Sequence, residues 1–277
     1  MSDLHGDKSH YRKLFAMVRE NIPSVVFLGG DLLPKIELLS GAGSSFINNF
    51  LAPNFSELKS DLGERYPHVF IILGNDDPRV YEKDIRDQES DKLWEYVHNT
   101  KATLGKYSII GYAFVPPSPF QLKDWERYDV SRFTDPGCVS PEEGFRTVEP
   151  VGRRTRYRTI AQDLEELTAD EEMTTTIMLF HTPPYQTKLD RAALDGKMVD
   201  HVPLDPHIGS IAVRRLIEKR QPLLTLHGHV HESAGITGSW RDQIGRTHLF
   251  TAAHDGPELA VVRFDPEDLK RASRTLI

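Results

Sequence analysis

The sequence of 277 residues has little of what defines several large classes of protein. It has one cysteine, Cys138, so no disulfide framework can form within the chain, and we expect a protein of a reducing cytoplasm. No stretch approaches the about 20 uncharged residues that span a bilayer, so we do not expect a membrane protein. The opening Met-Ser-Asp-Leu-His-Gly has neither a basic nor an apolar run, so no secretory signal is predicted.

Clustered basic residues are also lacking. The chain has 34 Lys and Arg against 41 Asp and Glu, a net charge of -7, and its basic residues do not run together into a stripe. Binding to the backbone of nucleic acids needs clustered Lys and Arg, so a nucleic-acid partner is not expected. The sequence leaves the oligomeric state open.

The pattern of apolar residues predicts a mixed α/β sandwich. We find no repeat, heptad or linker, so we predict a single domain over 1–277. Buried strands are predicted at 25–28, 69–73, 107–115, 174–180, 223–226, 248–252 and 259–264. Helices are predicted at 11–21, 45–62, 90–98, 159–167 and 210–220. Alternation in the first half indicates a parallel sheet with crossover helices, and the last three strands indicate a meander.

The segment 116–157 has no periodicity and carries Pro-Pro-Ser-Pro, Asp-Pro-Gly and Ser-Pro-Glu-Glu-Gly. Such long loops are uncommon in compact domains and are usually functional or disordered. Because Phe120, Trp125, Tyr128 and Phe133 provide apolar anchors, we predict an ordered flap; the alternative is a solvated surface insertion.

Polar side chains capable of binding metal stand directly after four of the predicted strands, and two more stand near the start of the chain. In α/β sheets these strand ends line the crevice where ligands bind. Singly, each residue is explained by turn chemistry or a strand cap. The set consists of Asp3, His5, Asp31, Asn75, His181, His229 and His231.

This ordered set, Asp-x-His, Gly-Asp, Gly-Asn, His and Gly-His-x-His, resembles the signature of the calcineurin-like metallophosphoesterase superfamily. The resemblance implies an α/β fold of four α-β-β-α layers with two mixed sheets, and two divalent metal ions at the strand ends. Carboxylate, amide and imidazole ligands suit Mn, Fe or Zn, and the identity stays open. By motif the first metal would be held by Asp3, His5 and His231, and the second by Asn75, His181 and His229, with Asp31 bridging both.

Two such ions predict a phosphoester hydrolase. Ions roughly 3.5–4 Å apart clamp the attacking and leaving oxygens, and a bridging hydroxide would attack phosphorus in line. The resemblance favours a small phosphodiester or nucleotide as substrate. The alternatives are a phosphomonoesterase, and a non-catalytic member that binds a phosphoryl ligand or a partner. The runs Lys123-Asp124-Trp125-Glu126 and Arg153-Arg154 lie in or beside the flap and are candidates for substrate contacts, although solvated surface charge is the favoured interpretation of any one of these residues.

The third block departs from the family pattern. The family commonly has His after Gly-Asn, which helps to protonate the leaving group, whereas this chain has Asp76. A carboxyl with a pKa of about 3.9 is ionised at pH 7 and cannot donate a proton. Either the neighbours of Asp76 raise its pKa, another group donates the proton, or the leaving group needs little help. We assign the catalytic roles to Asp31, Asn75, Asp76 and His229. Two spare histidines exist, for which a structural role is favoured: His227 and His254.

The start of the chain also departs from the pattern. In relatives the Asp-x-His block ends a buried first strand, but only Met1 and Ser2 precede Asp3 here. We therefore expect a truncated chain or a start placed too late. Asp3 and His5 are expected on a terminus that frays, so that the first metal is weakly held.

Overall fold

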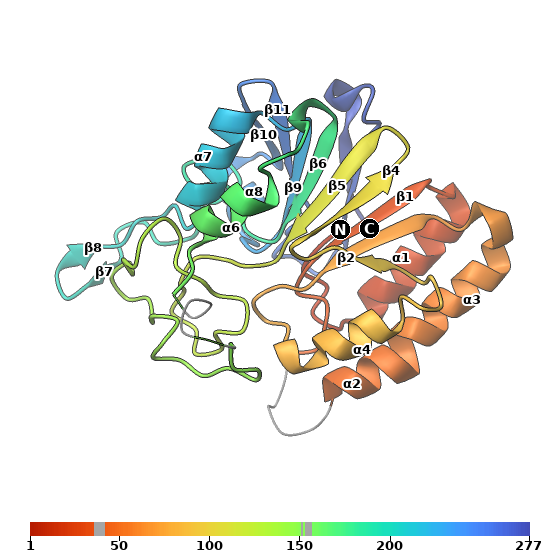
Figure 1. The fold of residues 1–277 in the computed structure, drawn as a ribbon, viewed down its shortest axis with the longest axis horizontal. Coiled ribbons are helices and arrows are strands. Elements are labelled where there is room, and N and C mark those ends of the chain that lie inside the picture. The colour runs from red at the N-terminus through yellow and green to blue at the C-terminus, as the bar shows by residue number, and fades with distance from the viewer. Residues whose placement is uncertain (36–41, 151, 153–156) are drawn as a thin grey trace.

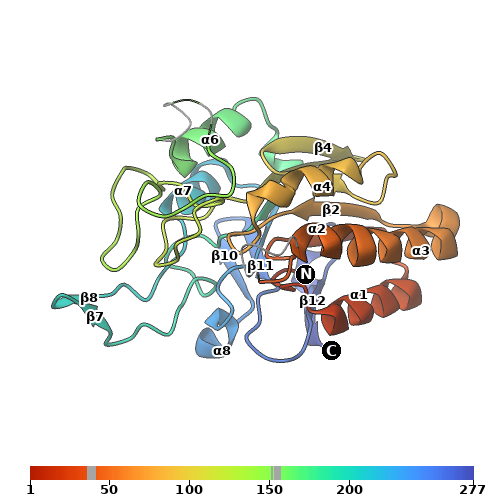
Figure 2. The ribbon, with the colours of Figure 1, turned by 90° about the horizontal axis from the view of Figure 1, so that it is seen from below.

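The computed structural model describes residues 1–35, 42–150, 152 and 157–277 (Figures 1 and 2). Its longer helices are α1 (Lys8–Asn21), α3 (Ala52–Leu62), α6 (Ile160–Leu167) and α7 (Ile211–Arg220). Shorter ones are α2 (Ala42–Phe46), α4 (Glu82–Asp87) and α8 (Ser233–Thr237), and the π-helical turn Ile47–Leu51 joins α2 to α3. None of the helices in the described part of the chain combines the length and apolar character that crossing a membrane requires.

Two sheets hold most of the strands. The three-stranded sheet is parallel, with the order β1 (Val25–Gly29), β2 (His68–Ile72) and β3 (Glu95–Tyr96). The six-stranded sheet has the order β10 (Arg241–Ile244), β11 (Thr247–Thr251), β9 (Leu224–His227), β6 (Thr176–Phe180), β5 (Tyr107–Tyr112) and β4 (Thr100–Leu104). Its four inner strands are parallel, and its two edge strands are antiparallel to their neighbours.

Two small antiparallel pairs stand apart from these sheets. One consists of β12 (Ala260–Arg263) and β13 (Ser273–Leu276), and the other of β7 (Met198–Val199) and β8 (Val202–Pro203). Figure 1 shows α1 and α3 on the side of β1 and β2, and α6 and α7 on the side of the six-stranded sheet. The predicted mixed α/β class is confirmed, and the count of four layers stays a prediction.

The local sequence explains the helix boundaries. The side chain of Asp7 accepts hydrogen bonds from two backbone N–H groups at the start of α1. Thr159 and Gln162 form a reciprocal capping box at the start of α6. Ser210 caps α7 by accepting from Val213 N. Each cap pairs donors that the first helical turn would otherwise leave unsatisfied.

All seven predicted strands are confirmed, as are four of the five predicted helices. The helix predicted at 90–98 is wrong, because Glu95 and Tyr96 pair with β2 as a parallel strand. Leu93, Tyr96 and Val97 are buried at a spacing that also fits one face of a helix, so periodicity misled the prediction. The predicted meander is wrong as well, because β11 runs parallel to β9 and β12 pairs with β13.

Isolated β-bridges tie the flap to the body of the fold. They join Val115 to Glu126 and Tyr128 to Thr159. Trp125 and Tyr128 are buried as predicted, but Phe120 and Phe133 are 58% and 68% exposed, so these two are not anchors. Backbone hydrogen bonds, such as Val115 N to Trp125 O at 2.9 Å, hold the segment instead. Residues 151 and 153–156, which include Arg153 and Arg154, lie outside the described residues.

The start of the chain is not frayed, contrary to the prediction. The amino group of Met1 donates to Phe27 O at 2.9 Å. Asp3 N and His5 N donate to Gly30 O and Asp31 O at 2.9 and 2.8 Å. The first residues therefore run parallel to the end of β1, and this pairing fixes the backbone of Asp3 and His5.

Candidate metal centre

The ends of parallel strands bring the predicted ligands to one place. Asp31 follows β1 and Asn75 follows β2 in the three-stranded sheet, while His181 follows β6 in the other sheet. His229 and His231 follow β9. Because the segment 1–6 lies along β1, it adds Asp3 and His5 to the same crevice.

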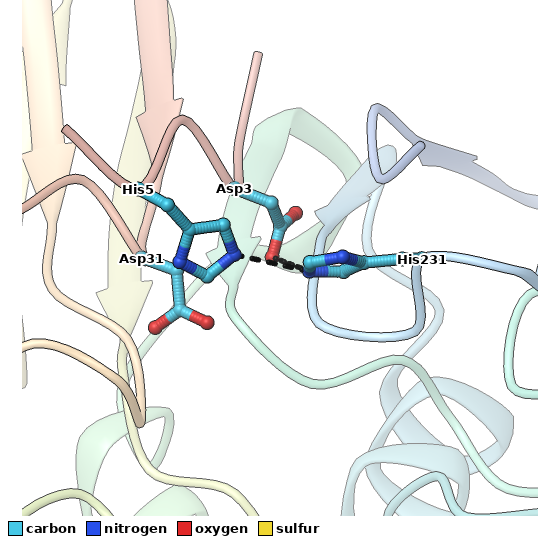
Figure 3. A group of neighbouring side chains, drawn as sticks. All are labelled: Asp3, His5, Asp31 and His231. Atoms are coloured by element: carbon cyan, nitrogen blue, oxygen red, sulfur yellow. Dashed lines mark hydrogen bonds and ion pairs between the residues drawn. The ribbon is translucent and has the colours of Figure 1, made fainter. Parts of the chain in front are cut away.

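The first group consists of Asp3, His5, Asp31 and His231, whose ligand atoms all lie within 4.8 Å of one another (Figure 3). Nε2 of His5 is 3.3 Å from Nε2 of His231, which is 3.3 Å from Asp3 Oδ1. The backbone N–H of His229 also donates to Asp3 Oδ1 at 3.0 Å. Four side chains from three distant parts of the sequence thus converge on one point.

The second group lies on the other side of Asp31. Nε2 of His181 is 3.0 Å from Asn75 Oδ1 and 3.3 Å from Asp31 Oδ2. The rings of His181 and His229 are 5.2 Å apart. Nδ1 of His181 hydrogen-bonds the carbonyl of Gly29 at 2.8 Å, which orients Nε2 toward the two oxygens.

The donor set of both groups fits divalent cations. In each group imidazole nitrogens face oxygens or other imidazole nitrogens, all of which are lone-pair ligands when the imidazoles are neutral. Nδ1 of His5 is buried without a hydrogen-bond partner. A cation between these atoms would satisfy them together, and carboxylate, amide and imidazole are ligands of Mn, Fe and Zn.

The electrostatics of the groups agree with this fit. Burial raises the pKa of Asp31, but His181 and His5 outweigh it and hold the pKa below its ordinary value. Burial and His181 lower the pKa of His229 to about 3. Burial lowers the pKa of His181, yet Asp31 outweighs it and raises the pKa to about 10. Asp31 is therefore ionised and His229 neutral, and a proton on His181 occupies the position that a cation would take.

Four of the predicted ligands have a left-handed backbone conformation. The φ angles are 58° at Asp3, 43° at His5, 52° at Asp31 and 73° at His229. Such angles are uncommon outside glycine and cost about 1–3 kcal/mol each unless the surroundings enforce them. Backbone strain at these positions is consistent with the side chains being aimed at a shared ligand.

Asp76 stands at the rim of the first group. Its N–H donates to Asp31 Oδ1 at 2.8 Å, and its Oδ2 lies 3.7 Å from His5 Nδ1 and 3.6 Å from Lys35 Nζ. Burial and the Asp31 carboxylate raise the pKa of Asp76. The side chain therefore lies beside two of the predicted metal ligands, in an environment that favours its protonated form.

The two spare histidines have structural contacts. His227 is buried, hydrogen-bonds Thr182 O and Thr225 Oγ1 at 2.9 and 2.7 Å, and stacks on Phe180. His254 pairs with Glu258 in its own loop at 3.1 Å. Neither set of contacts includes a predicted metal ligand.

The flap residues Lys123 and Trp125 are not free to contact a substrate. Lys123 is fully buried and pairs with Glu126 at 2.5 Å. Trp125 is buried too, and its Nε1 donates to Asp77 O at 2.7 Å. Trp125 therefore fastens the flap to the loop after β2. The charge of Lys123 is paired with Glu126 inside the flap, so it is neither solvated nor directed into the crevice.

Sequence reasoning missed Asp77, which joins the two loops that carry Asp31 and Asn75. Its carboxylate accepts from the backbone N–H groups of Leu32, Leu33 and Gly74 at 2.9, 2.7 and 2.8 Å. The sequence signal that could have found Asp77 was its place in Gly-Asn-Asp-Asp, where four polar or flexible residues follow a predicted strand. Only the structure shows that the second Asp points back into the fold, fully buried.

Comparisons with known proteins give a family and similar folds. The family model described as calcineurin-like phosphoesterase matches residues 1–233. The crystal structure of TT1561 from Thermus thermophilus is similar at a TM-score of 0.58 and 18% identity, covering 100% of this chain and 96% of that chain. A second crystal structure is similar at a TM-score of 0.57 and 17% identity, with coverage of 100% and 96%. No curated protein matches the chain.

Proposed function

The chain belongs to the calcineurin-like phosphoesterase family, and from this premise we propose that it hydrolyses a small phosphodiester or nucleotide with the help of two divalent metal ions. The family itself implies metal-dependent hydrolysis of phosphoesters. The number of ions and the substrate class are our proposal. The observation that supports two ions is the position of Asp31, whose carboxylate is within reach of both ligand groups.

The residues of the first group would hold one ion, and those of the second group the other, with Asp31 shared. When bound, such ions polarise a phosphoryl oxygen and lower the pKa of water. Asp31 and Asp3 supply the negative charge of the site, and the neutral His229 supplies a lone pair. The hydrogen bond from His181 to Gly29 O fixes which nitrogen of its ring is presented.

Lys35 and Asp76 would act on the substrate side. Asp76, with its pKa raised by burial and by Asp31, is placed to hold a proton near the leaving group. Lys35 is 70% exposed at its side chain and pairs loosely with Asp76 at 3.6 Å, so it is free to turn toward an anionic phosphoryl oxygen. Both residues come from the loops that carry Asp31 and Asn75.

One observation favours a second candidate function. Asp76 replaces the usual histidine, and a carboxylate at that place repels an anionic substrate when it is ionised. A member that binds a phosphoryl ligand without turnover is therefore the alternative. In that case ligand binding would persist while hydrolysis stayed at the background rate.

A metal titration followed by a substrate panel tests the proposal. The purified protein is stripped with chelator and titrated with Mn²⁺, and bound metal is counted by elemental analysis. We expect two ions per chain, and faster hydrolysis of bis-p-nitrophenyl phosphate than of p-nitrophenyl phosphate. The reverse preference would indicate a phosphomonoesterase. Binding of metal without hydrolysis of either compound would indicate the non-catalytic alternative.

A further inference from the structure

The flap run Lys123-Asp124-Trp125-Glu126 is buried, although three of its four residues carry a charge. We call this run the clamp. Side chains of Lys, Asp and Glu are almost never fully buried unless they are paired, so three of them within four positions need an explanation from their contacts. None of the four is among the predicted metal ligands, so the proposed site does not supply that explanation directly.

The first and last residues of the clamp fix its shape. Nζ of Lys123 donates to Glu126 Oε2 at 2.5 Å and to the carbonyl of Ser118 at 2.9 Å. Glu126 also accepts from the backbone N–H of Ser118 at 2.8 Å. Because all three bonds lie inside the flap, they close the segment 118–126 on itself. The two central residues of the clamp are therefore carried on a braced support.

Those two central residues hold the loop after β2, which carries Asn75. Nε1 of Trp125 donates to the carbonyl of Asp77 at 2.7 Å. Oδ2 of Asp124 accepts from the backbone N–H of Arg79 at 2.8 Å. The guanidinium of Arg79 also lies 5.0 Å from the centre of a Trp125 ring, within the range of an attractive cation–π contact. Three contacts thus join the clamp to this loop.

The loop that the clamp holds contains a tight turn. Asp77 N donates to Gly74 O at 3.1 Å, which closes a four-residue turn. Asn75 and Asp76 are its two central residues. The turn is packed directly on the metal centre, because a Cβ at Gly74 would come within 2.3 Å of Asp31 Oδ1. Contact with Asp31 bounds the turn on one side, and the clamp holds the residue that ends it.

We infer that the clamp positions the second ligand group: Trp125, acting through the turn that Asp77 ends, holds Asn75 Oδ1 beside His181 Nε2. The two atoms are 3.0 Å apart. Trp125 is a positioning residue, since its own contacts do not include the ligand atoms. The inference rests on the proposed function, because Asn75 serves as a ligand only if a second ion binds. Loss of an outer partner typically weakens metal binding about 10–100-fold.

The test replaces Trp125 with phenylalanine, which keeps an aromatic ring and removes the N–H that reaches Asp77. Trp94→Phe is the matched control, because Trp94 is also buried and its Nε1 donates to a backbone carbonyl, that of Ile85 in α4, at 2.9 Å. A general loss of stability would be similar in both. We expect Trp125→Phe to weaken the binding of one Mn²⁺ ion about tenfold or more, and Trp94→Phe to change Mn²⁺ affinity less than about twofold.

A double-mutant cycle with Asn75→Ala shows whether Trp125 acts through Asn75. In the protein that carries Asn75→Ala, we expect Trp125→Phe to change the remaining affinity for Mn²⁺ less than about twofold, because the ligand that it positions is gone. An undiminished effect in that background overturns the proposal. Equal effects of Trp125→Phe and Trp94→Phe in the unaltered protein overturn it as well.

Hydrogen exchange of the metal-free protein separates this inference from the two-ion proposal. The amide of Asp76 donates to Asp31 Oδ1 at 2.8 Å, so its exchange reports whether the turn stays against Asp31. We expect this exchange to be about tenfold faster in Trp125→Phe than in Trp94→Phe. Equal exchange in the two variants overturns the clamp whatever the number of ions. Faster exchange in a protein that binds a single ion would uphold the clamp and refute only the second ion.

Discussion

Replacing Asp77 with alanine tests how the two loops of the candidate metal centre are held together. The carboxylate is fully buried and accepts from three backbone N–H groups, two in the loop after β1 and one in the loop after β2. Alanine would leave all three donors unpaired and buried. Each such donor costs about 1–3 kcal/mol, and neighbouring losses are not additive, so we expect Asp77→Ala to lower the free energy of unfolding by about 3–5 kcal/mol.

Two further variants make this measurement specific. Asp77→Asn keeps one oxygen, which can still accept from Leu32 and Leu33, so we expect a smaller loss. Asp87→Ala is the matched control, because the side chain of Asp87 is half exposed and pairs with Lys83 on the surface. Surface pairs of this kind contribute about 0–1 kcal/mol. Urea unfolding of the metal-free proteins at one pH gives all the values.

Metal binding provides the second assay. Because Asp77 holds the loop of Asp31 against the loop of Asn75, its loss should weaken Mn²⁺ binding by about tenfold or more, as removal of outer-shell partners does elsewhere. A loss of unfolding free energy below about 1 kcal/mol in Asp77→Ala would refute the reasoning, since three buried donors cannot lose their acceptor at so small a cost.

Three other predictions concern catalysis and pH. Asp31→Asn should lower the hydrolysis rate by about 100-fold or more, because Asp31 is the ligand shared by both groups; an unchanged rate would contradict the metal assignment. Asp76→His should leave the hydrolysis rate within about tenfold of the original, because Asp76 with its raised pKa already holds a proton near the leaving group; a larger gain would contradict that role. Burial and nearby arginines hold the pKa of His98 well below its ordinary value, so His98 stays neutral in the fold and protonates in the unfolded chain. The free energy of unfolding that this contributes is fully present above a pH of about 6.5 and is lost as the pH falls, by about 1.4 kcal/mol between pH 7.5 and 5.5. His98→Asn should therefore flatten this part of the plot of unfolding free energy against pH, measured by urea unfolding.

The sequence predicted much of the fold and the candidate site because both depend on local patterns. Short β-rich runs placed all seven predicted strands, since buried strands need continuous apolar residues. Asp31, Asn75 and His181 stand directly after such strands, and the sequence predicted that they are neighbours because parallel strands end at one side of a sheet. The sequence did not distinguish helix from strand at 90–98, where the spacing of apolar residues fits both.

The tertiary structure decided what depends on contacts between distant residues. Asp77 holds two loops only because Leu32 and Leu33 pass beside it, 45 and 44 positions away in the sequence. The first residues are fixed because they pair with the end of β1, which no local pattern near Met1 indicates. Strand edges and buried hydrogen bonds are shared between segments, so their partners are set by the packing of the whole chain.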